Sequence, residues 1–384
     1  MVRWRSLSSA PTAVADRRED GTMTSVAQPK IFGAGLIALD LVIGPDPATP
    51  VRSWAGGTCG NVLSIMAYLG WDAYPIARMN GDPASDRVRS DMARWGVHLD
   101  WANCAPTTHT PIIVQEIRRG RDGRPRHRFS WACPHCGEWL PSFKAVTVSA
   151  VEAIKPALAG ASVFFLDRLS RATLTLAAEA SARGAVVVFE PSGKSNDKLM
   201  AEAIALAHVV KYADERLAGV DGVMAEGSAT LVEVQTLGEQ GLNYRHRLDD
   251  SVSDWTRLSA IPAVRLTDTC GSGDWCTAGL IAGAAAGGQG GLRRIGAGGV
   301  KSALRYGQAL AAWNCGFEGA RGGMYAVEPG KFAVQISQMM EGQLEYLVAE
   351  PVEVDPAQPI GCPACPPTLA GPRATRNGRS KRAA

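Results

Sequence analysis

Short apolar runs that alternate with helical segments are the feature that most restricts the fold of this 384-residue chain. Three of the runs, at residues 163–166, 186–189 and 231–234, consist mainly of Val, Phe and Leu, and each is too short for a buried helix. Helical patterns at 172–183 and 197–208 separate them. Buried strands joined through helices form parallel sheets that are covered on both faces. The sequence therefore predicts an α/β fold: a three-layer αβα sandwich with a mostly parallel central sheet.

Residues 107–140 interrupt this alternation. Two strand-like segments there, 112–118 and 126–132, flank a turn and have no helical pattern between them, which is typical of a β-hairpin. A proline-containing insertion near 41–55 interrupts the alternation a second time. We expect the two insertions to form a small β-sheet lid beside the central sheet.

The two ends of the chain differ in composition from its middle. Residues 1–27 and 351–384 are rich in Pro, Ser, Ala and Arg and show no sustained periodicity, so we expect a disordered N-terminal extension and a loose tail around a folded unit at 28–350. The formal net charge is +3, but the last fourteen residues contain five basic residues and no acid. The rest of the chain is slightly acidic, so a basic face for nucleic acid is not expected.

The sequence shows neither a secretion signal nor a membrane span. The first 30 residues lack the apolar stretch that a signal peptide needs. The longest uncharged run, 275–292, contains six glycines, four of them within 287–291, which is typical of a buried helix that runs into a turn. We therefore expect a cytoplasmic protein with no membrane partner.

The segment 268–274, with the sequence DTCGSGD, directly precedes an apolar helical pattern. Two glycines flank Ser272 at the expected helix start and leave the backbone N–H groups open. These amides and the helix dipole favour an anion at a helix N-terminus. Asp274 follows immediately and could accept a proton from a hydroxyl that attacks a phosphoryl group. The alternative interpretation of this short motif is an ordinary loop with Asp274 as a first-turn acid.

Several motifs in a fixed order give residues 30–345 a resemblance to the ribokinase-like (PfkB) family of sugar and nucleoside kinases. Segment 268–274 matches every defined position of the family's C-terminal signature, D-T-x-G-[AS]-G-D. Segment 236–241, TLGEQG, is similar to the T-x-G-x-x-G segment that lines the family's nucleotide site. The segments that resemble the first strand and the N-terminal signature are 33–40, 56–61, 69–70 and 80–82.

The resemblance implies an ATP-dependent kinase that phosphorylates a hydroxyl of a sugar or sugar-like small molecule, with ATP and Mg²⁺ as cofactors and a homodimer through the lid. It implies that Asp274 is the general base and that the amides of Gly271, Ser272 and Gly273 form an anion hole. The residues implied for the acceptor site are Asp40, Gly57 and Asn61, and those implied for the nucleotide site are Thr236, Gly238, Gly241 and Thr269.

Two segments depart from the family pattern near the expected magnesium site. Where members often have N-x-x-E, this chain has Ala213 and Arg216, so Asp214 or Glu215 would have to substitute. The strand end that resembles D-P-N begins with Glu190. We expect magnesium with an altered protein environment. Two alternatives to a sugar kinase stay open: a nucleoside kinase, and a non-catalytic ligand-binding or regulatory protein on the same fold.

Two C-x-x-C pairs lie outside the family pattern. Cys133 and Cys136 follow the hairpin, and Cys362 and Cys365 lie in the C-terminal tail. Four thiolates fit a tetrahedral zinc site, and a structural Zn²⁺ there would hold the tail against the lid. A redox dithiol and ordinary structural thiols are the alternatives.

The turn of the hairpin is surrounded by arginines. A solvated hairpin tip is one interpretation, because like charges repel least when exposed. The other is a lid that meets an anionic acceptor or the nucleotide phosphates. We interpret His127, on the second strand of the hairpin, as a lid-surface residue. The arginines are Arg118, Arg119, Arg121, Arg124, Arg126 and Arg128.

Overall fold

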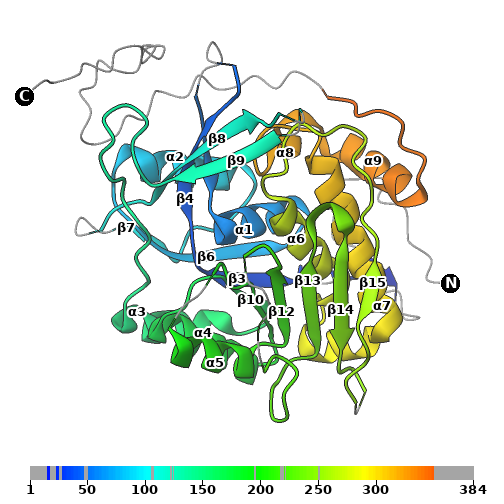
Figure 1. Cartoon of the computed structure of the whole chain (residues 1–384). Helices are drawn as coiled ribbons and strands as arrows, with labels where there is room; N and C mark the ends of the chain where they lie inside the picture. Colours follow the sequence, from blue (N-terminus) through cyan, green and yellow to red (C-terminus); the bar gives the residue numbers. More distant parts are fainter. Residues whose placement is uncertain are drawn as a thin grey trace, which may run out of the picture.

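The strands of the central sheet are parallel over most of its width (Figure 1). The computed structural model describes residues 15–17, 23–25 and 28–349, apart from gaps at 47–50, 105–107, 122, 124, 194–195, 217–219, 221 and 250. Within this part, nine strands lie in the order β15-β14-β13-β12-β11-β10-β3-β6-β7. All neighbouring pairs are parallel except the two that β14 makes. The bounds are β3 (Lys30–Ala34), β6 (Asp72–Met79), β7 (Ala102–Cys104), β10 (Ala161–Leu166), β11 (Val186–Phe189), β12 (Val209–Ala213), β13 (Val232–Thr236), β14 (Leu242–His246) and β15 (Thr256–Leu258).

Side chains of the central strands alternate between two hydrophobic cores. On β10, Val163 and Phe165 belong to one core and Phe164 and Leu166 to the other, because successive side chains of a strand point to opposite faces. Helices α1, α2, α6, α7, α8 and α9 contribute to the first core, and α3, α4 and α5 cover the opposite face (Figure 1). The predicted three-layer αβα sandwich is confirmed. The bounds are α1 (Thr58–Tyr68), α2 (Pro83–Arg94), α3 (Val148–Ile154), α4 (Arg171–Ala182), α5 (Asp197–Leu206), α6 (Ser272–Ala284), α7 (Gly288–Asn314), α8 (Gly322–Ala326) and α9 (Pro329–Glu341).

Helices α6 and α7 pack against each other through small residues. A Cβ atom on Gly279 would lie 2.3 Å from the Cα atom of Gly307, and one on Gly283 would lie 2.8 Å from the Cβ atom of Ala303. Both distances are too short for a side chain, so glycine is what allows this approach. The long uncharged run of the sequence is thus a buried helix that runs into a turn, as predicted.

A second sheet forms the predicted lid, in the strand order β5-β4-β8-β9 (Figure 1). Strands β8 (Ile112–Arg119) and β9 (Pro125–Ser130) are the expected antiparallel hairpin. Strands β4 (Ala38–Ile43) and β5 (Arg52–Gly56) come from the first insertion, and β4 pairs with β8. Two insertions far apart in sequence therefore build one lid. A homodimer through this lid stays a prediction.

The predicted extensions fall mostly outside the described residues. From the first 27 residues the structure describes strands β1 (Ala15–Arg17) and β2 (Met23–Ser25), which pair antiparallel. The whole predicted tail at 351–384, with Cys362 and Cys365, lies outside the described part. In that part, no helix combines the length and the apolar character needed to cross a membrane.

Candidate active site

Parallel strands bring several acidic and basic side chains to one edge of the sheet. Strands β3, β10, β11, β12 and β13 all end at this edge, because they run in the same direction. The residues that follow them carry much of the site. Asp167 follows β10 and is buried, and one of its carboxylate oxygens accepts a hydrogen bond from the Leu36 amide (2.9 Å). Glu190 follows β11. Sequence reasoning did not identify Asp167.

The loop before α6 has the shape of an anion-binding helix start. Gly271 caps the helix in the left-handed conformation (φ 75°), and no side chain caps the first amides. A Cβ atom on Gly271 would lie 2.3 Å from the carbonyl oxygen of Ala320, so the position requires glycine. Buried Asp268 holds the loop, because its carboxylate accepts hydrogen bonds from the amides of Cys270 and Gly319 (2.8 Å each). The Ser272 amide donates to the Thr269 carbonyl at 3.3 Å, and no side chain blocks the amides of this first turn from an anion.

Asp274, in the first turn of α6, is 8% exposed and meets Asn61 of α1. The Asn61 amide nitrogen donates a hydrogen bond to the Asp274 carboxylate at 2.7 Å, across 213 positions of sequence. Burial, and to a lesser extent the nearby Glu190 charge, raises the pKa of Asp274 to about 8. Two residues predicted for different parts of the site thus lie in contact, and the raised pKa brings the proton exchange of this carboxyl closer to neutral pH.

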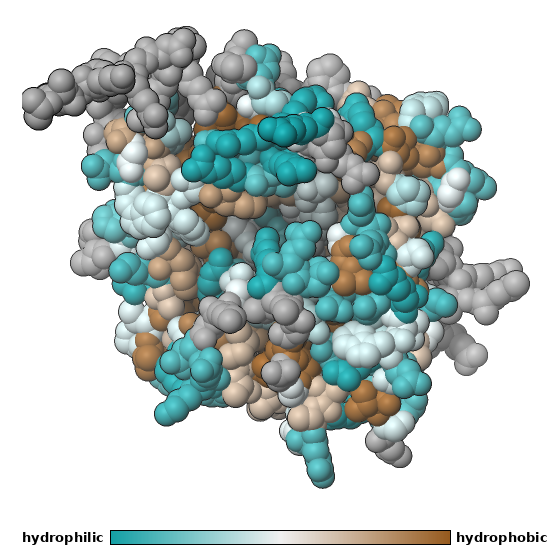
Figure 2. All heavy atoms as spheres, viewed as in Figure 1, coloured by the Kyte–Doolittle hydropathy of each residue, from teal (hydrophilic) through white to brown (hydrophobic). Residues whose placement is uncertain are grey.

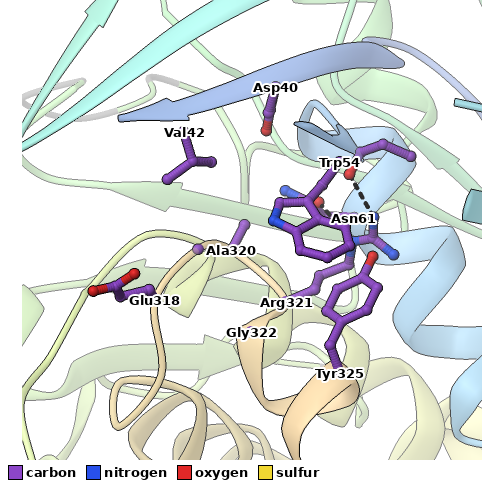
Figure 3. Close-up of a pocket in the computed structure, with 11 residues that line it drawn as sticks. Asp40, Val42, Trp54, Asn61, Glu318, Ala320, Arg321, Gly322 and Tyr325 are labelled. Atoms are coloured by element: carbon purple, nitrogen blue, oxygen red, sulfur yellow. Dashed lines mark hydrogen bonds between the residues drawn. The ribbon is translucent and has the colours of Figure 1, made fainter. Parts of the chain in front are cut away.

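Asp40 lines a small pocket that also includes Asn61 (Figure 3). Its carboxylate lies against Gly56, where a Cβ atom would come within 1.9 Å of Oδ2. The backbone N–H of Gly57, a residue with φ 76°, donates a hydrogen bond to the carboxylate. Burial raises the pKa of Asp40 to about 7, against the opposing effects of Arg321 and the Gly57 N–H. The three predicted acceptor residues are therefore brought together.

Arg321 is a buried residue of the same pocket that sequence reasoning missed. Its Nε donates to Asn61 Oδ1 (3.1 Å), and Nη2 donates to Asp91 Oδ2 (2.9 Å). The Tyr325 hydroxyl also donates to the Asp91 carboxylate (2.8 Å). Arg321 thereby fixes the orientation of the Asn61 amide, so that its nitrogen points to Asp274. The signal in the sequence that could have identified Arg321 was weak, because this arginine stands among glycines in a stretch without periodicity.

A buried ion pair lies below the anion-binding loop. Lys211 Nζ is 2.8 Å from Glu190 Oε1, and the Thr277 hydroxyl donates to Glu190 Oε2 at 2.5 Å. Burial, the largest single influence, acts to lower the pKa of Lys211, but the charge and hydrogen bond of Glu190 together with Cys276 and Asp274 raise it overall. A Cβ atom on Gly273 would lie 3.6 Å from Glu190 Oε1 and 3.7 Å from Lys211 Nζ. The ion pair therefore sits directly beneath one of the glycines of the loop.

Of the residues predicted to line the nucleotide site, Gly238 and Thr269 are exposed, Thr236 is half-buried and Gly241 is buried. Thr236 ends β13, and Gly238 and Gly241 begin and follow the short 3₁₀ turn after it. Gly241 has φ 96°, and a Cβ atom there would lie 2.1 Å from the carbonyl oxygen of Leu258, so glycine is required. Thr269 is exposed in the loop before α6. The glycine requirement explains the segment's sequence, and its role toward a nucleotide stays a prediction.

His127 does not lie on the free surface of the lid, contrary to the sequence interpretation. Its side chain is 14% exposed, and Nε2 lies 3.1 Å from Asp268 Oδ1 and 2.9 Å from the Thr269 hydroxyl. The lid therefore touches the anion-binding loop through this ring. The interpretation failed because the antiparallel register of β9 turns His127 toward the loop, while the described arginines at the tip, 118, 119, 121, 126 and 128, are exposed. Figure 2 shows hydrophilic side chains gathered over this hairpin, as expected of a solvated tip.

The first cysteine pair forms a tight turn. The Cys133 amide donates to the Glu138 carbonyl (2.8 Å), and the Gly137 amide donates back to the Cys133 carbonyl (3.0 Å). Cys133 is buried and Cys136 is exposed. Within the described residues, no three His, Cys, Asp or Glu side chains gather as a metal site would require. Because the second pair lies outside the described residues, the zinc site stays a prediction, which elemental analysis of the full chain would decide.

Comparisons with known proteins agree with this geometry. Residues 48–325 match the family described as pfkB family carbohydrate kinase. A fructokinase from Klebsiella pneumoniae is 28% identical over 282 residues, which cover 67% of this chain and 85% of the relative. The fold is similar to the crystal structure of a Xylella fastidiosa fructokinase with bound ATP (TM-score 0.61, 17% identity, covering 82% of this chain and 98% of that one). It is also similar to a Burkholderia thailandensis nucleoside kinase in complex with inosine (TM-score 0.56, 16% identity, 83% and 97%).

The family match spans most of the chain, and the similar structures share its fold. The chain therefore belongs to the pfkB family of carbohydrate kinases and is a sugar kinase.

Proposed function

We propose that this chain transfers the γ-phosphoryl group of ATP to a hydroxyl of a sugar or sugar-like small molecule. One observation supports the proposal above all others. The buried carboxylate of Asp274 stands in the first turn of α6, beside uncapped amides, and contacts Asn61 of the pocket that holds Asp40. A proton acceptor, an anion site and a hydroxyl-binding pocket thus meet at one point.

In this mechanism Asp274 takes the proton of the acceptor hydroxyl as the hydroxyl oxygen attacks the γ-phosphorus of ATP. The bond from the γ-phosphorus to the β–γ bridging oxygen breaks, and ADP leaves. The amides of Gly271, Ser272 and Gly273 donate to the phosphoryl oxygens, where negative charge develops. The hydrogen bond from Asn61 keeps the carboxylate aimed at the pocket. Closure of the lid over a bound acceptor would exclude water from the site, so that the phosphoryl group passes to the acceptor and not to water.

The acceptor would be held by Asp40 and Asn61, with the glycines beside Asp40 allowing its close approach. A carboxylate and an amide can bind adjacent hydroxyls of a sugar, because they supply acceptors and donors at fixed positions. Asp40 lies on the lid strand β4, and Asn61 lies on α1 beneath it. Acceptor binding would therefore join the lid to the main domain.

Magnesium would bind together with ATP. Mg²⁺ keeps several water ligands and is usually held by one or two carboxylates plus substrate phosphates. Glu190 would contact the ion through the water ligands of the ion. Its two carboxylate oxygens, which lie beneath Gly273, already accept hydrogen bonds from Lys211 and Thr277. When bound, the ion neutralises charge on the phosphate groups.

The proposal is tested by the ADP formed from ATP with D-fructose, D-ribose or inosine, each compared with a reaction that lacks an acceptor. Acceptor-dependent ADP formation with a sugar is the expected result. A clear preference for inosine would favour a nucleoside kinase instead. Binding of ATP without transfer to any acceptor would favour the non-catalytic alternative.

Acceptor phosphorylation should increase with pH until it reaches a plateau. Because burial raises the pKa of Asp274 to about 8, the base is available above that pH and becomes protonated as the pH falls through it. Below the pKa, kcat/KM for the acceptor should fall about tenfold per pH unit. A pH profile of kcat/KM, with thermal stability followed at each pH, checks this. A profile that is flat between about pH 6 and pH 9 would contradict the role of Asp274.

Gly271→Ala should lower kcat by about 10²-fold or more, because the new Cβ atom would collide with the Ala320 carbonyl and displace the amides of the anion hole. Gly342→Ala is a matched control. Gly342 also has a left-handed conformation, at the end of α9, but no atom lies within 4 Å of its Cβ position. The control should lose stability and keep kcat. Equal kcat in both variants would show that the amides do not contribute.

A further inference from the structure

We propose that Arg321 binds the acceptor directly and, with Asp40, selects an uncharged sugar over a sugar acid. This inference rests on the proposed function, because it concerns the same pocket. It adds a residue and a substrate class that neither the motifs nor the family match supplies.

Two polar atoms in the pocket have no hydrogen-bond partner among the described residues. They are Nη1 of Arg321, a donor, and Oδ1 of Asp40, an acceptor, and both are buried. Figure 3 shows that the two side chains line the same pocket but come from different elements, Asp40 from the lid strand β4 and Arg321 from the turn before α8. Buried polar groups are normally paired, so these two positions indicate a ligand with hydroxyl groups, which both donate and accept.

The rest of the Arg321 guanidinium is already held in place. Nε donates to Asn61, while Nη2 donates to Asp91 and to the Ala55 carbonyl. The Ala55 amide donates to Asp91 as well (2.8 Å). These contacts fix the plane of the guanidinium and direct the remaining nitrogen at the pocket. A lysine could pair with Asp91. It lacks the several fixed N–H donors of a guanidinium, so it could not also donate hydrogen bonds to Asn61 and to the acceptor at the same time.

The charges around the pocket favour an uncharged acceptor. Of the described residues that line it, Asp40 and Glu318 are acidic and Arg321 is basic. The positive charge of Arg321 is already balanced by Asp91, and Glu318 is balanced by Arg52 (2.9 Å). A carboxylate on the acceptor would therefore face Asp40 without an unbalanced cation beside it. Like charges so placed oppose binding.

The first arm of the test compares Arg321→Lys with Arg52→Lys, which makes the same exchange in the ion pair at the edge of the pocket. For the best uncharged acceptor, Arg321→Lys should raise KM by about tenfold or more, the loss expected of a hydrogen bond from a charged group. Its KM for ATP should change less than about twofold. Arg52→Lys should leave both values nearly unchanged. KM does not depend on how much of the sample is folded, so a loss of folded enzyme alone would not move this value. Displacement of Asn61 would also disturb Asp274 and lower kcat, so a raised acceptor KM with kcat nearly unchanged is the result expected of a direct contact.

The second arm compares D-gluconate with D-fructose as acceptors for the wild-type chain. We expect kcat/KM to be at least about 100-fold lower for gluconate, because of its repulsion from Asp40. Two results would overturn the inference alone: an acceptor KM in Arg321→Lys within twofold of wild type, or a preference for gluconate. Absence of transfer to every acceptor by the wild-type chain would instead count against the proposed function and, through it, against this inference.

Discussion

Asp274→Asn should lower kcat by about 10²–10⁴-fold, while the affinity for ATP stays within a few-fold of wild type. Asparagine has nearly the same volume as aspartate and can still accept the hydrogen bond from Asn61. It cannot take up a proton, so the attacking hydroxyl loses its base. The substitution leaves in place the backbone at the start of α6, where we propose that the phosphates bind. Initial rates with saturating acceptor, together with ATP binding by calorimetry, measure the two effects.

The control for this substitution is Asp197→Asn, which makes the same change in the exposed first turn of α5. It should behave as wild type in both measurements. If Asp274→Asn kept full turnover, Asp274 would not be the base. If it lost ATP affinity to the same degree as turnover, the carboxylate would act in nucleotide binding and not in proton transfer.

Asp40→Asn and Asp40→Ala should each raise the KM for the acceptor by about 10- to 100-fold, since a buried carboxylate that accepts from a hydroxyl makes a strong hydrogen bond. The KM for ATP should hardly move, because Asp40 lies on the lid strand β4 in the pocket proposed for the acceptor, while the phosphates are proposed to bind the amides at the start of α6. Burial raises the pKa of this carboxyl to about 7, so the wild-type advantage should itself shrink at acidic pH.

Glu318→Gln is the matched control for Asp40, because Glu318 lines the same pocket but is paired with Arg52. A small effect there, next to a large one at Asp40, would separate a direct contact from a general change of charge. The assignment of Asp40 would be wrong if the KM for ATP rose while that for the acceptor stayed constant.

The fold and the glycine-containing loop before α6 could be predicted because their signals are local. Apolar runs of four residues, a hairpin without an intervening helix, and glycines before a helix each depend on neighbours in sequence. The role of Arg321 could not be predicted in the same way. Its partners Asn61 and Asp91 lie 260 and 230 positions away, and no periodicity links them.

His127 illustrates the same limit from another side. The sequence indicates the strand β9, but it does not indicate where the lid lies relative to the loop before α6. That position brings Nε2 of His127 within 3.1 Å of Asp268 Oδ1. Contacts between two sheets depend on how the sheets are placed. The sequence of one strand does not contain that information.

The glycine contacts between α6 and α7 have a consequence for how acceptors of different length are handled. With Gly279 against Gly307, the two backbones touch, so α6 cannot shift along its neighbour and Asp274 has a fixed position. Asp40 belongs to a lid strand, so any change in its distance from Asp274 would have to come from the inclination of the lid. An acceptor that is one carbon too long or too short could then still bind to Asp40 with the lid at a different inclination. Its reacting hydroxyl, however, would not lie at the right distance from Asp274. Length discrimination should accordingly appear in turnover more than in binding.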